Sequence, residues 1–205
     1  MTMPRRLLPL LLCAGLLALA AGCSNAPPRP NFPELSFTAE PPIRLDVVRI
    51  DVRNDYQPPF RAPNVDHLFP VPPMRAADDW ARDRLKATQP IGTGGLELLG
   101  VFTLKNASVT ETDLPQQTGI TSMFTTQPGK RYDLTLQATV QITDAQGIPL
   151  RSASVTVKRS QTQPDGITPN DRDRAWYAMT KTAMAAFDRQ MEAEIRNNFG
   201  IYYDQ

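Results

Sequence analysis

Apolar and polar residues alternate without interruption over residues 132–143. One face of that stretch would carry only apolar side chains, namely Tyr132, Leu134, Leu136, Ala138, Val140 and Ile142. An unbroken period of two over this length predicts a strand that is buried on one face. Residues 144–147, Asp-Ala-Gln-Gly, indicate a turn, and residues 150–159 alternate again. The two stretches together predict a β-hairpin.

Two further stretches predict strands, and each contains an irregularity. Residues 43–52 alternate, but the phase shifts by one after Val47, which indicates either a β-bulge or a strand that changes the face it buries. Residues 96–112 predict a long strand in which Gly100 would mark a bulge. The prolines of residues 58–73 cannot donate hydrogen bonds to a sheet, so we expect an irregular connection there.

Apolar residues recur with helical spacing in two places. Residues 74–88 predict a helix whose packed face carries Ala77, Trp80, Ala81, Leu85 and Thr88. A longer helix is expected to begin at Thr168, because Thr, Pro and Asp follow the preferences of a helix N-terminus, and to end at Gly200. Its apolar stripe consists of Trp176, Met179, Ala183, Phe187, Met191, Ile195 and Phe199. We interpret this stripe as core; a surface that binds lipid or another helix is the alternative.

These elements follow one another in the order β-α-β-β-β-α. One β-α-β crossover followed by an antiparallel meander, with every strand apolar on one face, predicts an α+β fold. We expect a two-layer sandwich in which a mixed four-stranded sheet carries two helices on one face. A single domain of this kind would span residues 43–205.

The N-terminal residues have the pattern of a secretory signal. Arg5 and Arg6 precede an uncharged apolar run over residues 7–21, and small residues follow the run. A transmembrane helix is the alternative, but at about 1.5 Å per residue the run would span only about 22 Å of a hydrocarbon core of roughly 30 Å. We therefore predict a signal peptide over residues 1–22.

The end of this signal is more specific. Residues 19–23, Leu-Ala-Ala-Gly-Cys, resemble a bacterial lipobox, although Ala20 stands where that motif usually has Leu. The resemblance implies that Cys23 becomes the lipidated first residue of the mature protein; a cysteine beside an ordinary cleavage site is the alternative. Ser24 follows the cysteine, and by resemblance to sorted lipoproteins this implies the periplasmic leaflet of the outer membrane. Residues 23–42 are rich in proline and predict an extended tether.

Composition excludes several kinds of chemistry. The 205 residues include 22 Lys and Arg against 21 Asp and Glu, so the broad basic field of a nucleic-acid-binding protein is absent. No cysteine follows Cys23, which removes a disulfide, a thiol nucleophile and a thiolate metal site from the mature chain. His67 is the only histidine, so a catalytic triad would have to use a residue within the proline-rich connection. We predict neither a metal nor a cofactor.

The whole layout carries a second resemblance. A lipobox, a proline-rich tether, the β-α-β-β-β-α order and a long C-terminal amphipathic helix are similar to small outer-membrane lipoproteins of lipopolysaccharide assembly and of ABC transport. The resemblance implies a non-enzymatic, lipid-anchored periplasmic protein that binds a protein or lipid partner in envelope assembly, transport or secretion. A periplasmic hydrolase that acts on glycan or lipid through carboxylates is the alternative. The lack of spare histidine and cysteine favours the accessory protein.

The connection over residues 114–129 is long for a compact domain, and connections of this length are often functional. Ile120, Met123 and Phe124 lie there among Thr, Ser and Gln, and no charged residue stands between Pro115 and Gly129. We predict that these three side chains contact an envelope partner or a lipid, because removing water from an uncharged apolar loop tip costs little free energy. The alternative is that they fold back onto an edge of the sheet.

Overall fold

The computed structural model describes residues 30–90, 97–115 and 128–204. The chain divides into two units, residues 1–30 and residues 31–205, and the fold described below is that of the second. The predicted signal peptide, Cys23, and the apolar residues Ile120, Met123 and Phe124 lie outside the described residues.

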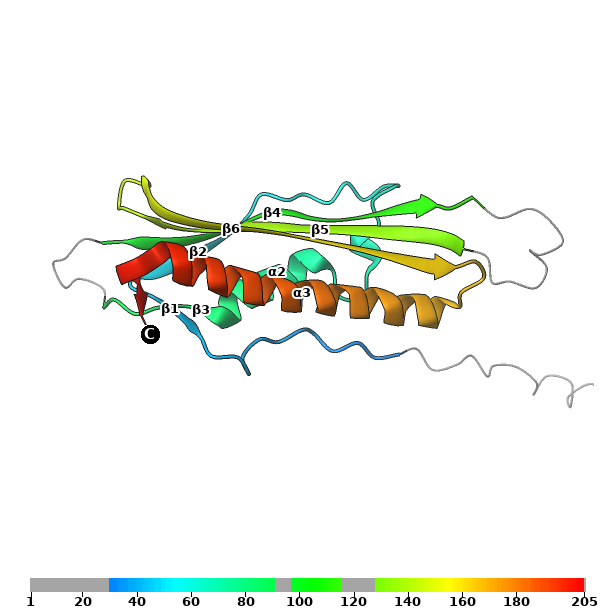
Figure 1. The fold of residues 1–205 in the computed structure, drawn as a ribbon, viewed down its shortest axis with the longest axis horizontal. Helices are drawn as coiled ribbons and strands as arrows, with labels where there is room; N and C mark the ends of the chain where they lie inside the picture. The colour runs from blue at the N-terminus through cyan, green and yellow to red at the C-terminus, as the bar shows by residue number, and fades with distance from the viewer. Residues whose placement is uncertain (1–29, 91–96, 116–127, 205) are drawn as a thin grey trace, which may run out of the picture. The chain divides into compact units, whose positions relative to one another are not determined.

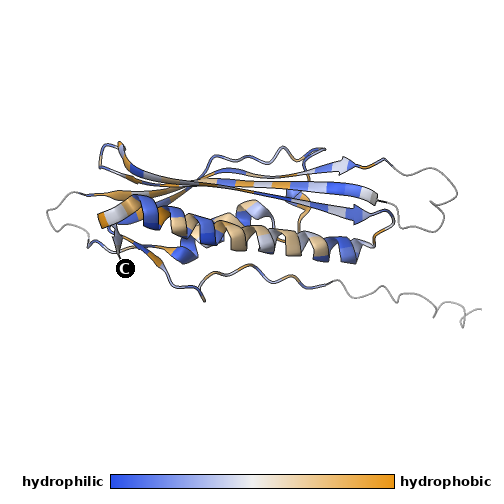
Figure 2. Cartoon of the chain, viewed as in Figure 1, coloured by the Kyte–Doolittle hydropathy of each residue, from blue (hydrophilic) through white to orange (hydrophobic). Residues whose placement is uncertain are grey.

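A four-stranded mixed sheet forms one layer of the fold (Figure 1). Its strands, in spatial order, are β2 (Arg49–Asn54), β4 (Leu99–Asp113), β5 (Pro128–Thr143) and β6 (Pro149–Pro164). β2 is parallel to β4, whereas β4, β5 and β6 form an antiparallel meander. Apolar and polar residues alternate along these strands (Figure 2), and all six apolar positions predicted for β5 are buried. The predicted hairpin and sheet are confirmed.

A second, smaller sheet corrects the prediction of one strand over residues 43–52. That segment forms β1 (Ile43–Leu45), which pairs with β3 (Leu85–Ala87) and β7 (Tyr203–Asp204), and then crosses to the large sheet as β2. Between the two strands the Val47 amide donates to the Leu45 carbonyl at 2.8 Å, which makes a tight bend. The phase shift in the sequence therefore marks a strand that leaves one sheet for another.

Two long helices cover one face of the large sheet, as predicted. α2 spans Pro73–Arg84 and α3 spans Pro169–Phe199. α3 begins as expected, since Thr168 Oγ1 accepts a hydrogen bond from the Asp171 amide and Pro169 occupies the first turn. The prediction that the first helix continues to Thr88 was wrong, because residues 85–87 pair with β1 instead.

The core lies between the helices and the sheet. Trp80 of α2 packs between Phe102 of β4 and Phe187 of α3, with ring centroids 5.8 and 4.9 Å away. Every residue of the predicted α3 stripe is buried. The interpretation of that stripe as core is thus confirmed, and the α+β two-layer architecture is the fold of this chain.

The proline-rich connection is ordered and covers one edge of the sheet. β2 pairs with only the first half of β4, and residues 55–65 continue along the rest. The amides of Asp55 and Val65 donate to β4 carbonyls, and the Glu111 amide donates to the Pro63 carbonyl. The predicted bulge at Gly100 was wrong: the irregularity lies between Leu104 and Asn106. A Cβ on Gly100 would lie 3.1 Å from Ile50 Cγ1, so this glycine permits close packing of β2 on β4.

Candidate functional site

The two ends of the connection over residues 114–129 lie side by side at the end of the sheet. The Leu114 amide donates to the Gly129 carbonyl at 3.0 Å, which joins the end of β4 to the start of β5. The contact residues predicted on this connection, Ile120, Met123 and Phe124, lie outside the described residues. The structure therefore gives the base of the predicted contact loop rather than its tip.

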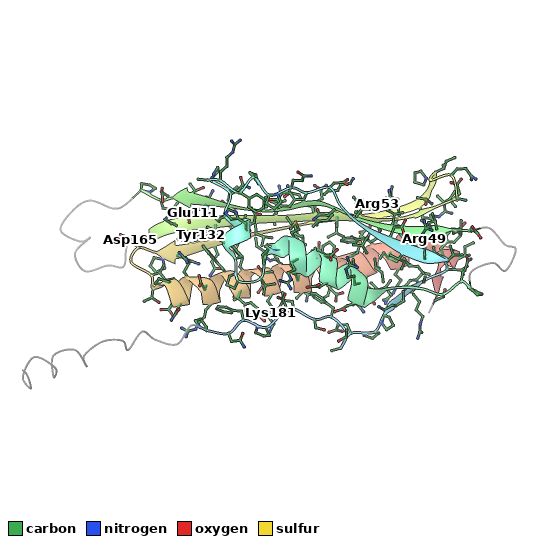
Figure 3. The ribbon with its side chains drawn as sticks, turned by 180° about the vertical axis from the view of Figure 1, so that it is seen from behind. Arg49, Arg53, Glu111, Tyr132, Asp165 and Lys181 are labelled. Atoms are coloured by element: carbon green, nitrogen blue, oxygen red, sulfur yellow. The ribbon has the colours of Figure 1, made fainter. Side chains whose placement is uncertain are left out.

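A polar pocket lies at this base, and we call it the end pocket. It has a volume of about 220 Å³ and is lined by the ends of β4, β5 and β6 and by the start of α3. Figure 3 shows Glu111, Tyr132 and Asp165 at this end of the sheet. Lys130, Gln163 and Arg172 complete its polar lining.

The ionic groups of the end pocket are paired. Lys130 makes ion pairs with Glu111 and Asp113, and the hydrogen bond with Glu111 raises the pKa of Lys130. Burial raises the pKa of Tyr132, and the neighbouring Glu111 carboxylate raises it further, so the hydroxyl stays protonated. The Arg172 guanidinium lies 4.4 Å from the centre of the Trp176 ring and pairs with Asp173. With its charges balanced, the pocket presents no isolated anion or cation to a ligand.

Gln163 differs from its neighbours in the end pocket. It is buried on the inner face of β6, and neither of its amide atoms has a hydrogen-bond partner in the structure as described. A buried amide without partners is costly and usually has a partner in the working protein. The pocket is thus suited to bind an uncharged polar group, and no sequence pattern singled out Gln163.

A groove between residues 35–40 and α3 was also missed by the sequence analysis; we call it the α3 groove. Its volume is about 410 Å³, Leu35, Phe37 and Met184 contribute apolar surface, and Lys181 and Arg189 are exposed beside it. Lys181 is labelled in Figure 3. The segment is held in place because the Phe37 amide donates to the Asp83 carboxylate at 2.8 Å. Glu40, Asp188 and Glu192 also line it, so the groove combines an apolar surface with charges of both signs.

The only histidine of the sequence lies in a turn of the proline-rich connection. His67 lies in a short 3-10 turn (Asp66–Leu68), its ring packs edge-on against Phe60, and its Nδ1 atom is buried without a partner. Asp66 is buried beside Tyr56, and burial together with the Asp66 charge raises the pKa of the Tyr56 hydroxyl. In the described segments no hydrogen bond joins His67 to a serine or threonine hydroxyl, so a nucleophile–base pair is not assembled there.

Carboxylates that could act as an acid–base pair are engaged elsewhere. Asp188 and Glu192 lie one turn apart on α3, and both accept from the buried guanidinium of Arg84 at 2.7 and 2.6 Å. Asp188 also accepts from Trp80 Nε1 at 2.7 Å. On the outer face of the sheet, Arg49 and Arg53 (labelled in Figure 3) both pair with Asp51. These groups stabilise the fold, since each carboxylate already has a cationic partner.

The described ranges contain neither a cluster of metal-ligand side chains nor a helix suited to cross a membrane. No group of three or more potential ligand side chains that could hold a metal ion occurs within residues 30–90, 97–115 and 128–204. No helix in those ranges combines the length and apolar character needed to cross a bilayer.

Solved structures similar to this chain include two bacterial lipoproteins. No protein-family model matches the chain, and neither does any curated protein. A minor lipoprotein from Acinetobacter baumannii aligns with 13% identity and a TM-score of 0.38, over 78% of this chain and 98% of that one. Rare lipoprotein B from Shewanella oneidensis aligns with 11% identity and a TM-score of 0.37, over 73% of this chain and 95% of that one. Both similar proteins are bacterial lipoproteins, but at these scores the alignments do not establish a role for this chain.

Proposed function

We propose that this chain is a lipid-anchored, non-enzymatic accessory protein of the bacterial envelope. It would be attached through Cys23 to the periplasmic leaflet of the outer membrane and bind a protein or lipid partner in envelope assembly, transport or secretion. The observation that carries the proposal is the Leu-Ala-Ala-Gly-Cys sequence of residues 19–23, directly after an apolar signal. Acyl chains on one cysteine contribute roughly 0.8 kcal/mol for each buried methylene, so two or three chains hold a protein firmly.

The described domain supports binding rather than catalysis. Asp188 and Glu192 on α3 are paired with Arg84, and the histidine packs against Phe60. Its cavities instead offer an unpartnered amide in the end pocket and an apolar surface in the α3 groove. Such features fit recognition of a partner, because they provide contacts without an activated nucleophile.

Replacing Cys23 with serine is expected to abolish lipidation. Metabolic labelling with a palmitate analogue should be lost, and the protein should leave the outer-membrane fraction and the detergent phase. Cys13→Ser is the matched control, because Cys13 lies inside the predicted signal and should leave with it. Labelling and detergent partitioning that survive in Cys23→Ser would refute the anchor.

Replacing both Met123 and Phe124 with serine tests the predicted contact loop. If the side chains form a docking tip, stability should change by no more than about 0.5 kcal/mol, as for surface positions. Recovery of partner, or binding to liposomes, should fall by more than about tenfold, because each apolar side chain buried on docking contributes roughly 1.5–3 kcal/mol.

The control for the loop variant is Ile148→Ser. Ile148 is an exposed apolar residue in the turn between β5 and β6, so it matches the chemistry but lies at the other end of these strands. It should leave both stability and recovery unchanged. A large loss of stability in Met123→Ser/Phe124→Ser would show that these residues belong to the core.

A further inference from the structure

The two edges of the large sheet are treated differently by the fold. On the β2 side, β2 and the proline-rich connection hydrogen-bond to β4 along its length. On the other side β6 pairs with β5 along one edge only, and no backbone hydrogen bond from the described residues reaches its outer edge. β6 has 16 residues, and Figure 1 shows it running along α3. Among the residues that the structure describes, the sheet therefore has one covered edge and one open edge.

Two side-chain contacts indicate which residues of β6 face outward. Arg151 donates to the Leu150 carbonyl at 2.7 Å, and Arg159 donates to the Lys158 carbonyl at 3.2 Å. The amide and carbonyl of one strand residue point to the same side, and the side alternates from residue to residue. Even-numbered residues thus present their backbone groups to solvent, including the stretch between the two arginines.

The middle of this edge lacks the usual protection. Ser152, Ser154 and Thr156 carry no charge, and the register with β5 is regular from Lys130 opposite Gln163 to Ile142 opposite Arg151. Exposed edges are normally blocked by lysine, proline or a bulge within the strand. Here the cations Arg151, Lys158 and Arg159 stand on both sides of an unprotected centre. The free amides and carbonyls of that centre form a template for another strand.

A groove lies beside the Arg159 end of this edge. It has a volume of about 260 Å³ between β6 and α3, and its lining includes Ala178, Met179 and Thr182 from the helix. Ala178 and Thr182 are exposed although they lie beside the sheet. Because these side chains are small, an inward-facing residue at that end of an added strand has room above α3.

The charge at this edge selects the partner. Arg151, Lys158 and Arg159 have no carboxylate partner in the part of the chain that the structure describes. A second copy of the chain is disfavoured in the antiparallel register centred on Val155. Arg151 of one copy would there face Arg159 of the other, since both lie four residues from Val155. Like charges directly opposite destabilise strand pairing. An acidic segment would pair with them favourably.

We propose that the outer edge of β6 accepts an extended acidic segment of a partner protein as a fifth strand of the large sheet. Backbone hydrogen bonds to Ser152, Ser154 and Thr156 supply affinity, and Arg151 and Arg159 select carboxylates at the two ends of the added strand. The inference goes beyond the proposed function, because neither Cys23 nor residues 114–129 form this surface.

Hydrogen exchange of the full-length lipidated protein in detergent micelles tests the open edge directly. Without ligand, the amides of Ser152, Ser154 and Thr156 should exchange fast, whereas those of Ala153 and Val155, bonded to β5, should exchange slowly. The probe is a ten-residue synthetic peptide of alternating valine and threonine with glutamate at both ends. It should slow the three even-numbered amides by at least about tenfold, as expected for newly formed strand hydrogen bonds. Slow exchange at those amides in the free protein would overturn the proposal.

Two variants separate backbone pairing from charge. Ser154→Pro removes one outward amide while leaving the β5 ladder intact, so it should weaken peptide binding at least about tenfold; Ser154→Ala keeps the amide and is the control. The double variant Arg151→Glu/Arg159→Glu changes side-chain charge only and leaves the backbone unaltered. It should bind a lysine-ended peptide in preference to the glutamate-ended one. Three results would each overturn the proposal. They are equal binding of both peptides to the unaltered protein, unchanged peptide binding by Ser154→Pro, and a protein dimer that excludes the peptide.

Discussion

Replacing Phe187 with alanine is expected to lower the free energy of unfolding by about 3–5 kcal/mol. Phe187 is fully buried on α3, and its ring packs edge-to-face with that of Trp80, with centroids 4.9 Å apart. Trp80 in turn packs on Phe102 of the sheet, so the alanine would open a cavity where both helices and the sheet meet. Denaturant titration followed by far-UV circular dichroism measures the loss.

The control is Gln190→Ala, on the exposed part of the same helix. It should change stability by no more than about 0.5 kcal/mol. A loss of that small size in Phe187→Ala would contradict the assignment of the α3 stripe to the core. It would also restore the alternative that the stripe binds a lipid or a partner helix.

Replacing Asp188 with alanine is expected to cost about 3 kcal/mol or more. Arg84 is only 1% exposed, and Asp188 accepts from its Nε atom at 2.7 Å. In the variant, the buried guanidinium of Arg84 would keep Glu192 as its one carboxylate partner. The Trp80 indole would also lose its hydrogen-bond acceptor. Removing one partner of a buried ion pair is strongly destabilising because the other charge remains out of water.

Two comparison variants test this explanation. Asp78→Ala removes an exposed partner of Arg82 and should cost about 0.5 kcal/mol or less, because such surface pairs contribute little. Arg84→Met/Asp188→Leu removes both buried charges and should be more stable than Asp188→Ala. If the double variant is the less stable of the two, the uncompensated charge is not the cause of the loss.

Elements whose signals are local were predicted well. The alternation of residues 132–143 identified β5, and the Thr168–Pro169 start with Gly200 at the end identified α3. Each of these signals depends only on residues that are close together in the sequence. The reason is that side-chain direction repeats with the backbone geometry of the element itself. The four-stranded mixed sheet with helices on one face followed from the order of these elements, which gives one β-α-β crossover and a meander, and from the apolar face of each strand.

Features that depend on remote partners were not predicted. Residues 85–87 continue a helical stripe in the sequence, yet they form β3 because β1 offers them a parallel partner about forty residues away. Arg84 stands at a position that the sequence shows only as charged, and it is buried because Asp188 and Glu192 approach it from α3. The α3 groove arises because residues 35–40, expected to be part of an extended tether, lie against α3.

The sequence by itself therefore determined which face each main element buries, the order of the elements, and the lipobox that predicts the anchor at Cys23. Only the tertiary structure decided which strands pair, which buried charges meet, and that the described residues leave the outer edge of β6 unpaired. The physical reason is that periodicity records the local environment of each side chain, whereas pairing depends on surfaces brought together from distant parts of the chain.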